Sequence, residues 1–269
     1  MAKRLFSCLL AFSLVFVLCA CGAPQQSTAP AEPAEAVPEA AVATPEVVEE
    51  SEPTYEVTYS SCKAVPSDSA DAMFACAYVQ TIFAVKNTSD VAISFMDGYY
   101  DITDQNGAAV ESPSTYNLPV YVAPGETAYI GFINPTNNQA YLTAESLIAT
   151  PTFYIDKAFF TPVQLDVGNY EYLFEPDGVY NNYGTGMSQP GRGFVVIGDI
   201  NNATSERVSN ASISVTFFNN DTPIGVISSF SDAVPANSSA SFEVSDSFLG
   251  KFIMSDEITS TEISVTAMP

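Results

Sequence analysis

Histidine and tryptophan are both missing from the 269 residues of this chain. Without histidine, the chain has no imidazole for a Ser-His-Asp or Cys-His catalytic set and no histidine ligand for a metal ion. The sequence also pairs no two carboxylates in an apolar setting that would raise the pKa of one of them, as glycoside hydrolysis requires. We therefore predict a protein without enzymatic activity, without a cofactor and without a metal site.

Basic residues are scarce. The chain has 8 Lys and Arg against 31 Asp and Glu, which gives a formal net charge of −23. Phosphate recognition needs clusters of Lys and Arg, so this balance excludes nucleic acid as a partner. Hydrophobic residues make up 47% of the chain and charged residues only 14%, which is enough apolar material to build a packed core.

The N-terminus has the pattern of an export signal. Lys3 and Arg4 precede the uncharged apolar run 5–18, which is shorter than the roughly 20 residues of a membrane-spanning helix. The run ends in Leu18-Cys19-Ala20-Cys21, which resembles the lipobox of bacterial lipoproteins. That resemblance implies removal of residues 1–20 as a signal peptide and a diacylglycerol on Cys21. An ordinary secretory signal is the alternative.

Residues 21–53 differ in composition from the rest of the chain. After Cys21 this stretch contains six prolines and seven glutamates, and it has no basic or aromatic residue. Proline favours the extended polyproline II conformation and like charges swell a chain, so we predict a disordered, acidic tether. Together with lipidation, this places the protein on the outer face of the cytoplasmic membrane, in a cell that we expect to be Gram-positive.

From residue 54 to residue 269 the sequence predicts an all-β fold. Short segments rich in Val, Ile, Thr, Phe and Tyr alternate with turn residues, and only 143–149 resembles a helical turn. The expected strands are 55–61, 78–86, 91–100, 127–132, 152–159, 193–200, 211–218, 239–244 and 262–266. A chain of this kind closes as antiparallel β-sandwiches.

An internal repeat divides this region in two. In each copy a strand ends in Asn, a polar turn leads to an alternating strand with aromatic residues, and a tight hairpin follows. Each copy then has a turn led by proline that opens another strand, at Pro124 and at Pro235. Matching Asn87 with Asn201 gives an offset of 201 − 87 = 114 residues, a natural size for one sandwich domain.

The first copy resembles the FxLYD-type, immunoglobulin-like domains of bacterial envelope lipoproteins. The matching features are Asn87, the Tyr100-Asp101 hairpin with Gly107, and the turn Pro124-Gly125-Glu126. The second copy departs from the pattern, since Asn219 stands where Asp is usual. The resemblance implies two tandem immunoglobulin-like sandwiches, at 54–164 and 165–269, and an envelope location. It implies no particular activity.

Cys62 and Cys76 are the only cysteines beyond the lipobox region. In an exported protein two cysteines so close in sequence predict a disulfide. Two buried free thiols are the alternative, and a zinc site is short of ligands because the chain has no histidine.

Aromatic residues are dense between positions 141 and 183. The simplest interpretation is that these rings fill a core and the seam between domains. The alternative is a binding surface for a sugar or another small ligand. Its candidate residues are Tyr172, Tyr180, Asn181, Asn182 and Tyr183.

Together these patterns predict a non-enzymatic envelope lipoprotein that binds another envelope component, foremost a protein. The negative charge favours a basic protein or a neutral ligand. The alternative function is carbohydrate or small-ligand binding through the aromatic segment 170–186.

Overall fold

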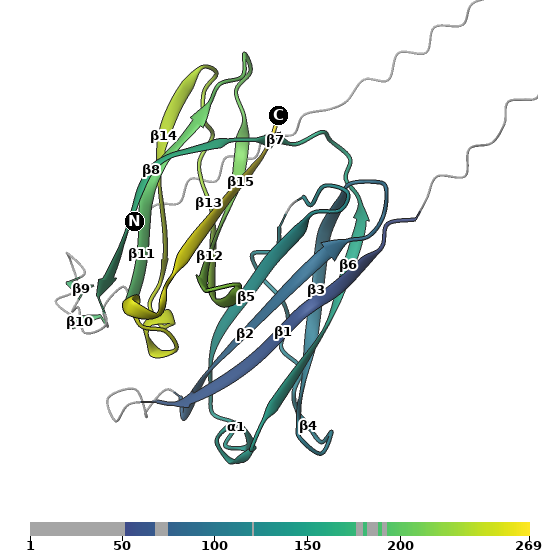
Figure 1. Ribbon diagram of the computed structural model, residues 1–269, viewed down its shortest axis with the longest axis vertical. Helices are drawn as coiled ribbons and strands as arrows, with labels where there is room; N and C mark the ends of the chain where they lie inside the picture. The colour runs from purple at the N-terminus through teal and green to yellow at the C-terminus, as the bar shows by residue number, and fades with distance from the viewer. Residues whose placement is uncertain (1–51, 68–74, 120, 176–179, 182–187, 190–192) are drawn as a thin grey trace, which may run out of the picture. The chain divides into compact units, whose positions relative to one another are not determined.

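The computed structural model describes residues 52–67, 75–119, 121–175, 180–181, 188–189 and 193–269. The predicted fold class is confirmed: the described residues form β-sandwiches of antiparallel sheets with very little helix (Figure 1). They all belong to one compact unit, Glu49–Pro269. Among these described residues, no helix has the length and hydrophobicity needed to cross a membrane.

Two three-stranded sheets build the first sandwich, with the orders β1-β2-β5 and β4-β3-β6. Their strands are β1 (Tyr55–Pro66), β2 (Ala77–Asn87), β3 (Ile93–Asp104), β4 (Ala109–Glu111), β5 (Thr127–Thr136) and β6 (Leu147–Lys157). Alternate residues of the strands turn inward and form a core that is rich in aromatic rings. At its centre Phe83 packs edge-on against Tyr100 and Phe153, with ring centroids 5.6 Å and 6.0 Å away.

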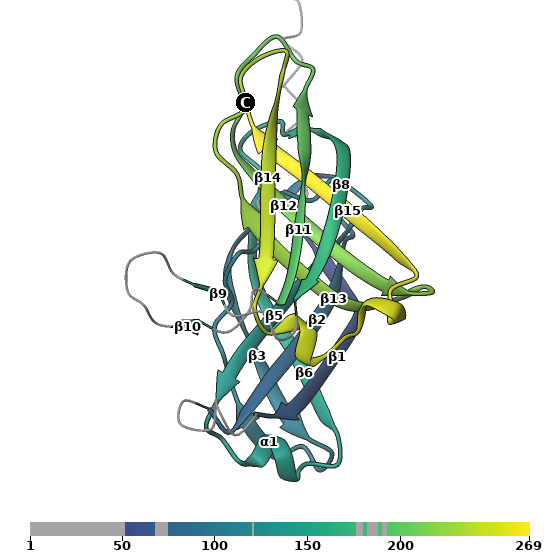
Figure 2. The same cartoon turned by 90° about the vertical axis from the view of Figure 1, so that its left-hand side faces the viewer.

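The second sandwich pairs the sheet β14-β11-β8 with the sheet β13-β12-β15-β7 (Figure 2). Its strands are β7 (Val163–Gln164), β8 (Asp166–Glu175), β11 (Gly193–Asn202), β12 (Ser209–Asn219), β13 (Thr222–Phe230), β14 (Ser238–Asp246) and β15 (Ser260–Met268). Its core is more aliphatic, with Phe194 and Phe217 as its fully buried rings.

Short elements complete the fold. A two-stranded ribbon joins β9 (Tyr180–Asn181) and β10 (Ser188–Gln189), and two 3₁₀ turns, η1 (Leu249–Lys251) and η2 (Ser255–Glu257), precede β15. The only α-helix of the described residues is the single turn α1 (Ala140–Thr143). The helical turn predicted at 143–149 is therefore wrong, because the helix ends at Thr143 and β6 begins at Leu147.

The connection between the sandwiches lies between β6 and β7. Strand β7 pairs with β15, so Val163 and Gln164 belong to a sheet of the second sandwich. Leu165 lies in the second core. The predicted domain limits, 54–164 and 165–269, stay predictions, since all these strands belong to one compact unit.

A buried asparagine ends the corresponding strand of each sandwich. The Nδ2 of Asn87, at the end of β2, donates to the carbonyls of Val91 (2.8 Å) and Val122 (3.0 Å). The Nδ2 of Asn202, at the end of β11, donates to the carbonyls of Glu206 (2.8 Å) and Val234 (3.0 Å). The two sandwiches therefore share this feature of the repeat in three dimensions. The residue that corresponds to Asn87 is Asn202, so the predicted match to Asn201 is wrong by one residue.

The hydroxyl two residues further on completes each of these sites. Ser89 Oγ donates to Asn87 Oδ1 at 2.6 Å, and Thr204 Oγ1 donates to Asn202 Oδ1 at 2.7 Å. The Asn-x-Ser/Thr triplets at these two positions are therefore structural hydrogen-bonding units. They hold the start of the following turn against the Pro-led turn more than 30 residues away.

Strand β2 is buried on both faces, and this joins the two sandwiches. Val79, Phe83 and Val85 point into the first core. The alternate residues Tyr78, Gln80, Ile82 and Ala84 face outward, yet each is at most 4% exposed. A strand that reads as a continuous apolar run is buried on both sides, and here the second cover is the second sandwich.

Strand β13 and the segment after β14 provide that cover. Gln80 Nε2 donates to the Ile224 carbonyl at 3.2 Å, and the rings of Tyr78 and Phe248 stack with centroids 4.7 Å apart. A Cβ on Gly131 of β5 would lie 2.7 Å from Val226 Cβ, so the two backbones approach closely at this point. Glycine at position 131 is what this close contact requires.

Loss of either asparagine should destabilise the fold. We expect Asn87→Ala and Asn202→Ala each to lower the free energy of unfolding by about 3 kcal/mol, because each leaves at least two carbonyls without their donor. Chemical denaturation of each variant measures this loss. The control Asn106→Ala, at an exposed hairpin tip, should cost under about 1 kcal/mol. Equal losses at all three positions would contradict the structural role.

The contact at Gly131 gives a second test. We expect Gly131→Ala to lower the free energy of unfolding by about 1–3 kcal/mol, because the added methyl group overpacks the contact with Val226. Hydrogen exchange should then speed up in β2, β5 and β13 while β12 keeps its protection. An unchanged denaturation midpoint would show that the sandwiches do not depend on this close approach.

Candidate functional site

A row of hydroxyl groups lines the outer face of the sheet that holds β12 and β15. The strand register places Ser212 opposite Thr266, Ser214 opposite Ser264 and Thr216 opposite Glu262. The residues between them on both strands, such as Val215 and Val265, point into the core. This strict alternation leaves a polar outer face with one carboxylate at its end.

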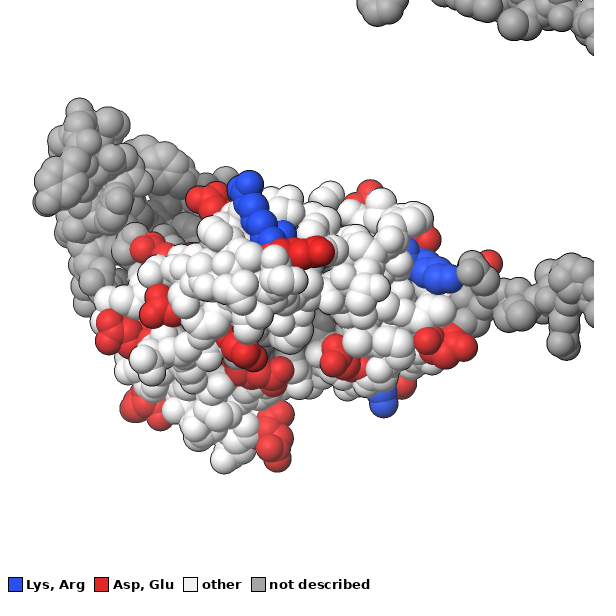
Figure 3. All heavy atoms as spheres, turned by 90° about the horizontal axis from the view of Figure 1, so that it is seen from above, with Lys and Arg blue, Asp and Glu red and all other residues white. Residues whose placement is uncertain are grey.

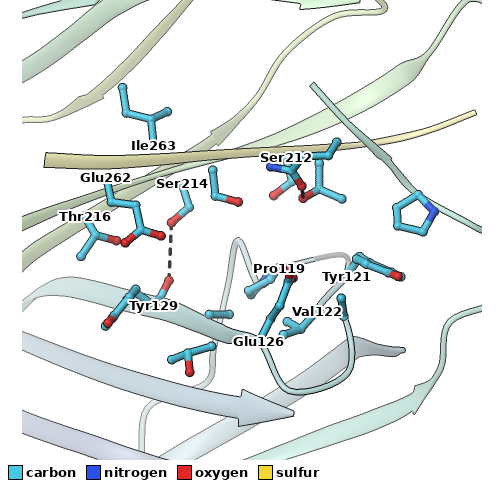
Figure 4. Close-up of a pocket in the computed structure, with 17 residues that line it drawn as sticks. Pro119, Tyr121, Val122, Glu126, Tyr129, Ser212, Ser214, Thr216, Glu262 and Ile263 are labelled. Carbon is cyan, nitrogen blue, oxygen red and sulfur yellow. Dashed lines mark hydrogen bonds between the residues drawn. The ribbon is translucent and has the colours of Figure 1, made fainter. Parts of the chain in front are cut away.

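Pro119 and residues 121–129 of the first sandwich form the opposite wall. Pro119, Tyr121, Glu126 and Tyr129 line it, and Figure 4 shows the Glu126 side chain pointing from its loop toward β12 and β15. Ser214 Oγ donates to the Tyr129 carbonyl at 3.5 Å and so links the two walls. We call the space between these walls the hydroxyl cleft.

Asn87 also fixes the turn that carries Glu126. The Gly125 N–H donates to the Asn87 carbonyl at 3.0 Å, and the Asn87 N–H donates to the Glu126 carbonyl at 2.9 Å. Gly125 has a φ of 77°, a left-handed conformation that glycine adopts without strain. The Pro-Gly-Glu turn identified in the sequence therefore sets the position of one carboxylate of the cleft.

The hydroxyl cleft has a volume of about 570 Å³ and a one-sided charge. Glu126 and Glu262 project into it, and no Lys or Arg is found among its described lining residues. Burial, and then the charge of Glu262, raise the pKa of Tyr129. Burial, and then the charge of Glu126, raise the pKa of Tyr121. The negative potential of each carboxylate thus reaches a phenol of the cleft.

A second surface of interest is the outer face of β3 and β6. Tyr99 and Tyr154 lie side by side on it with ring centroids 6.4 Å apart, and Tyr154 and Ile148 are each 53% exposed. The register sets Asp97 opposite Tyr154, while Asp101 follows on the same face of β3. These five residues define the acidic tyrosine face. In the view of Figure 3, acidic side chains are scattered over the surface and basic ones are few.

The aromatic segment proposed from the sequence is only partly described. Tyr172 is 38% exposed, and its ring packs edge-on against the core residue Phe217 at 6.2 Å. The backbone of Tyr180 and Asn181 forms β9, while Asn182 and Tyr183 lie outside the described residues. The structure therefore assigns Tyr172 a packing contact, and the side chains of the other members of the predicted set lie outside what it describes.

Next to this segment lies a shallow hollow that the sequence did not single out. It has a volume of about 560 Å³ and forms over β8, β11 and β14. Tyr170, which is 43% exposed, borders it together with Asn169 and Asp199.

Cys62 and Cys76 do not form the predicted disulfide. Both are free thiols. Cys62 lies opposite Thr81 in the β1–β2 ladder, whereas the Cys76 carbonyl accepts from the Ser67 N–H. The register therefore separates the two cysteines by five positions, about 17 Å along the strand. A disulfide needs Cα atoms within about 7 Å. Strands β1 and β2 pair in a register that keeps the thiols apart.

The lipidation residue Cys21 lies outside the described residues, and so does the tether up to residue 51. Within the described ranges, no three Cys, Asp or Glu residues gather in a way that could hold a metal ion. The arrangement of both surfaces suits reversible recognition by hydrogen bonds and charge.

Sequence reasoning missed both the hydroxyl cleft and the acidic tyrosine face. The alternation of Ser212, Ser214 and Thr216 with apolar residues was a readable signal for a polar outer face. Its partner wall comes from a segment about 90 residues earlier, which only tertiary structure brings close. Searches for related proteins give no identification: no protein-family model and no curated protein matches this chain.

The cysteine assignment can be tested by thiol labelling. Burial raises the pKa of the Cys62 thiol to about 12, so at pH 8 only roughly one thiol in ten thousand is ionised and reactive. We expect Cys62 and Cys76 of unreduced protein each to gain one alkyl group from iodoacetamide in denaturant, and Cys62 to stay unmodified in the folded protein. A protein mass two hydrogens lower than that of the reduced chain, with no alkylation at these two positions, would show instead that the disulfide forms.

Proposed function

We propose that this chain is a lipid-anchored, extracytoplasmic binding protein without enzymatic activity, and that its partner is a basic protein of the bacterial envelope. The lipobox-like Leu18-Cys19-Ala20-Cys21 supports the anchor at the outer face of the cytoplasmic membrane. The strand-Asn-turn repeat supports the finer relationship to FxLYD-type, immunoglobulin-like domains of envelope lipoproteins.

The acidic tyrosine face is the observation that carries the proposed protein binding. Tyrosine is enriched at interfaces because its ring buries much area at a low entropic cost while its hydroxyl stays hydrogen-bonded. Tyr99 and Tyr154 give this face an apolar centre, and Asp97 and Asp101 flank Tyr99 along β3. Ile148 lies further along β6, opposite Thr103. A partner with Lys or Arg beside an apolar patch would complement it, and the charge of −23 would attract such a partner over a distance.

Cross-linking on intact native cells, followed by affinity recovery and mass spectrometry, tests this proposal. We expect a stoichiometric basic protein to be recovered with the wild-type chain. The double variant Tyr99→Ser/Tyr154→Ser should lower its recovery at least about tenfold, as removal of central interface aromatics does. Tyr170→Ser, an exposed tyrosine of the second sandwich, is the matched control and should leave recovery unchanged. Absence of any stoichiometric partner, or equal recovery with the double variant, would contradict the proposal.

Binding of a carbohydrate or another small neutral ligand is the second candidate function. The hollow bordered by Tyr170, Asn169 and Asp199 favours it, since a ring beside amide and carboxylate groups is typical of sugar recognition. Under this alternative, Tyr170→Ser would abolish retention on a glycan array while the double variant on the other sandwich would keep it.

A further inference from the structure

The hydroxyl cleft has the features of a built ligand site that is independent of the acidic tyrosine face. It lies where the two sandwiches meet, and its volume of about 570 Å³ falls within the range of roughly 300–1,000 Å³ that is usual for small-molecule sites. We propose that the cleft binds a small organic cation that carries several hydroxyl groups, of the chemical class of an amino sugar.

The charge of the cleft argues for a cation. Glu126 and Glu262 enter from the two walls, and none of the described lining residues is Lys or Arg. The two carboxylates give the cleft a negative potential, which attracts an ammonium group. The same field excludes anionic ligands.

The hydroxyl groups argue for a polyhydroxylated ligand. Ser212, Ser214 and Thr216 repeat every second residue, about 7 Å apart, and their counterparts on β15 lie about 5 Å across the ladder. Each hydroxyl can donate or accept a hydrogen bond, so this grid can match the alternating hydroxyls of a sugar ring.

The arrangement of the carboxylates in the cleft fits an organic cation better than a metal ion. A divalent cation such as Ca²⁺ needs six to eight oxygen ligands drawn close together. In the described part of the chain, no group of three metal-ligating side chains is found here or elsewhere. A primary ammonium group has three N–H donors, so one carboxylate and two further hydrogen-bond acceptors satisfy it, and one wall of the cleft can supply them.

Isothermal titration of the full chain, purified in mild detergent at low ionic strength, tests the proposal. The probes are glucosamine, glucose and glucuronate, which differ in charge on a similar ring. We expect glucosamine to bind, glucose to bind at least about tenfold more weakly, and glucuronate not to bind. Added salt should weaken glucosamine binding, because an ion pair is screened.

Variants assign the binding to the cleft. Glu262→Gln and Glu126→Gln preserve size. Loss of the carboxylate that binds the ammonium group should weaken glucosamine binding about tenfold, and loss of the other should weaken it less, through the field alone. Glu145→Gln, an exposed glutamate of the first sandwich, is the matched control and should have no effect. Ser214→Ala should also weaken binding, and thermal unfolding checks that every variant stays folded.

Three outcomes would overturn the proposal: no heat of binding with millimolar glucosamine, equal affinity for glucose, or unchanged affinity in both glutamine variants. The test is separate from the one for protein binding. Tyr99→Ser/Tyr154→Ser should leave glucosamine binding intact, so either proposal can fail while the other holds.

Discussion

The double-sided burial of β2 is the constraint on which the rest of the structure depends. One face of this strand supplies Phe83 to the aromatic core of the first sandwich, and the other face lies under the second sandwich. Removing the second cover would expose Tyr78, Ile82 and the buried amide of Gln80. At about 25 cal/mol per Å² of apolar surface, two such side chains alone favour the joined state by several kcal/mol. The sandwiches therefore behave as one unit.

That junction also creates the hydroxyl cleft. Because β5 and β13 meet closely at Gly131, the neighbouring residues 121–129 lie over the outer face of β12 and β15 without filling the space. The buried Asn87 completes the geometry by holding the Pro-Gly-Glu turn that carries Glu126. Hydrogen bonds of Asn87 within the first sandwich thus fix the position of the Glu126 carboxylate relative to β12 and β15 of the second.

The acidity of the chain has a different meaning on each surface. On the acidic tyrosine face, Asp97 and Asp101 flank the exposed rings of Tyr99 and Tyr154. This arrangement suits a large partner that covers the rings and the carboxylates together. In the cleft, two exposed carboxylates border a polar space and give it a negative potential that would favour a small cationic ligand. Surface charges elsewhere are dispersed and contribute mainly solubility and repulsion of anionic polymers.

The sequence by itself determined the all-β class, the approximate positions of most strands and the turn residues of the repeat. These features depend on local alternation and on the backbone preferences of Asn, Gly and Pro. Local pattern also showed that Cys62 and Cys76 lie in or beside paired strands. Only the register, set by packing over the whole ladder, decided that they lie apart.

Tertiary structure alone decided which outward faces became buried and which stayed open. Gln80 of β2 and Ser214 of β12 are both polar outward residues in alternating or apolar strands. Gln80 is buried where β2 meets β13 of the second sandwich, while Ser214 lines the hydroxyl cleft. The apolar run of β2 and the alternation of β12 indicate this difference locally, but the partner that covers or faces each strand depends on contacts between residues more than 80 positions apart. For the same reason the candidate sites emerged only when the two sandwiches were brought together.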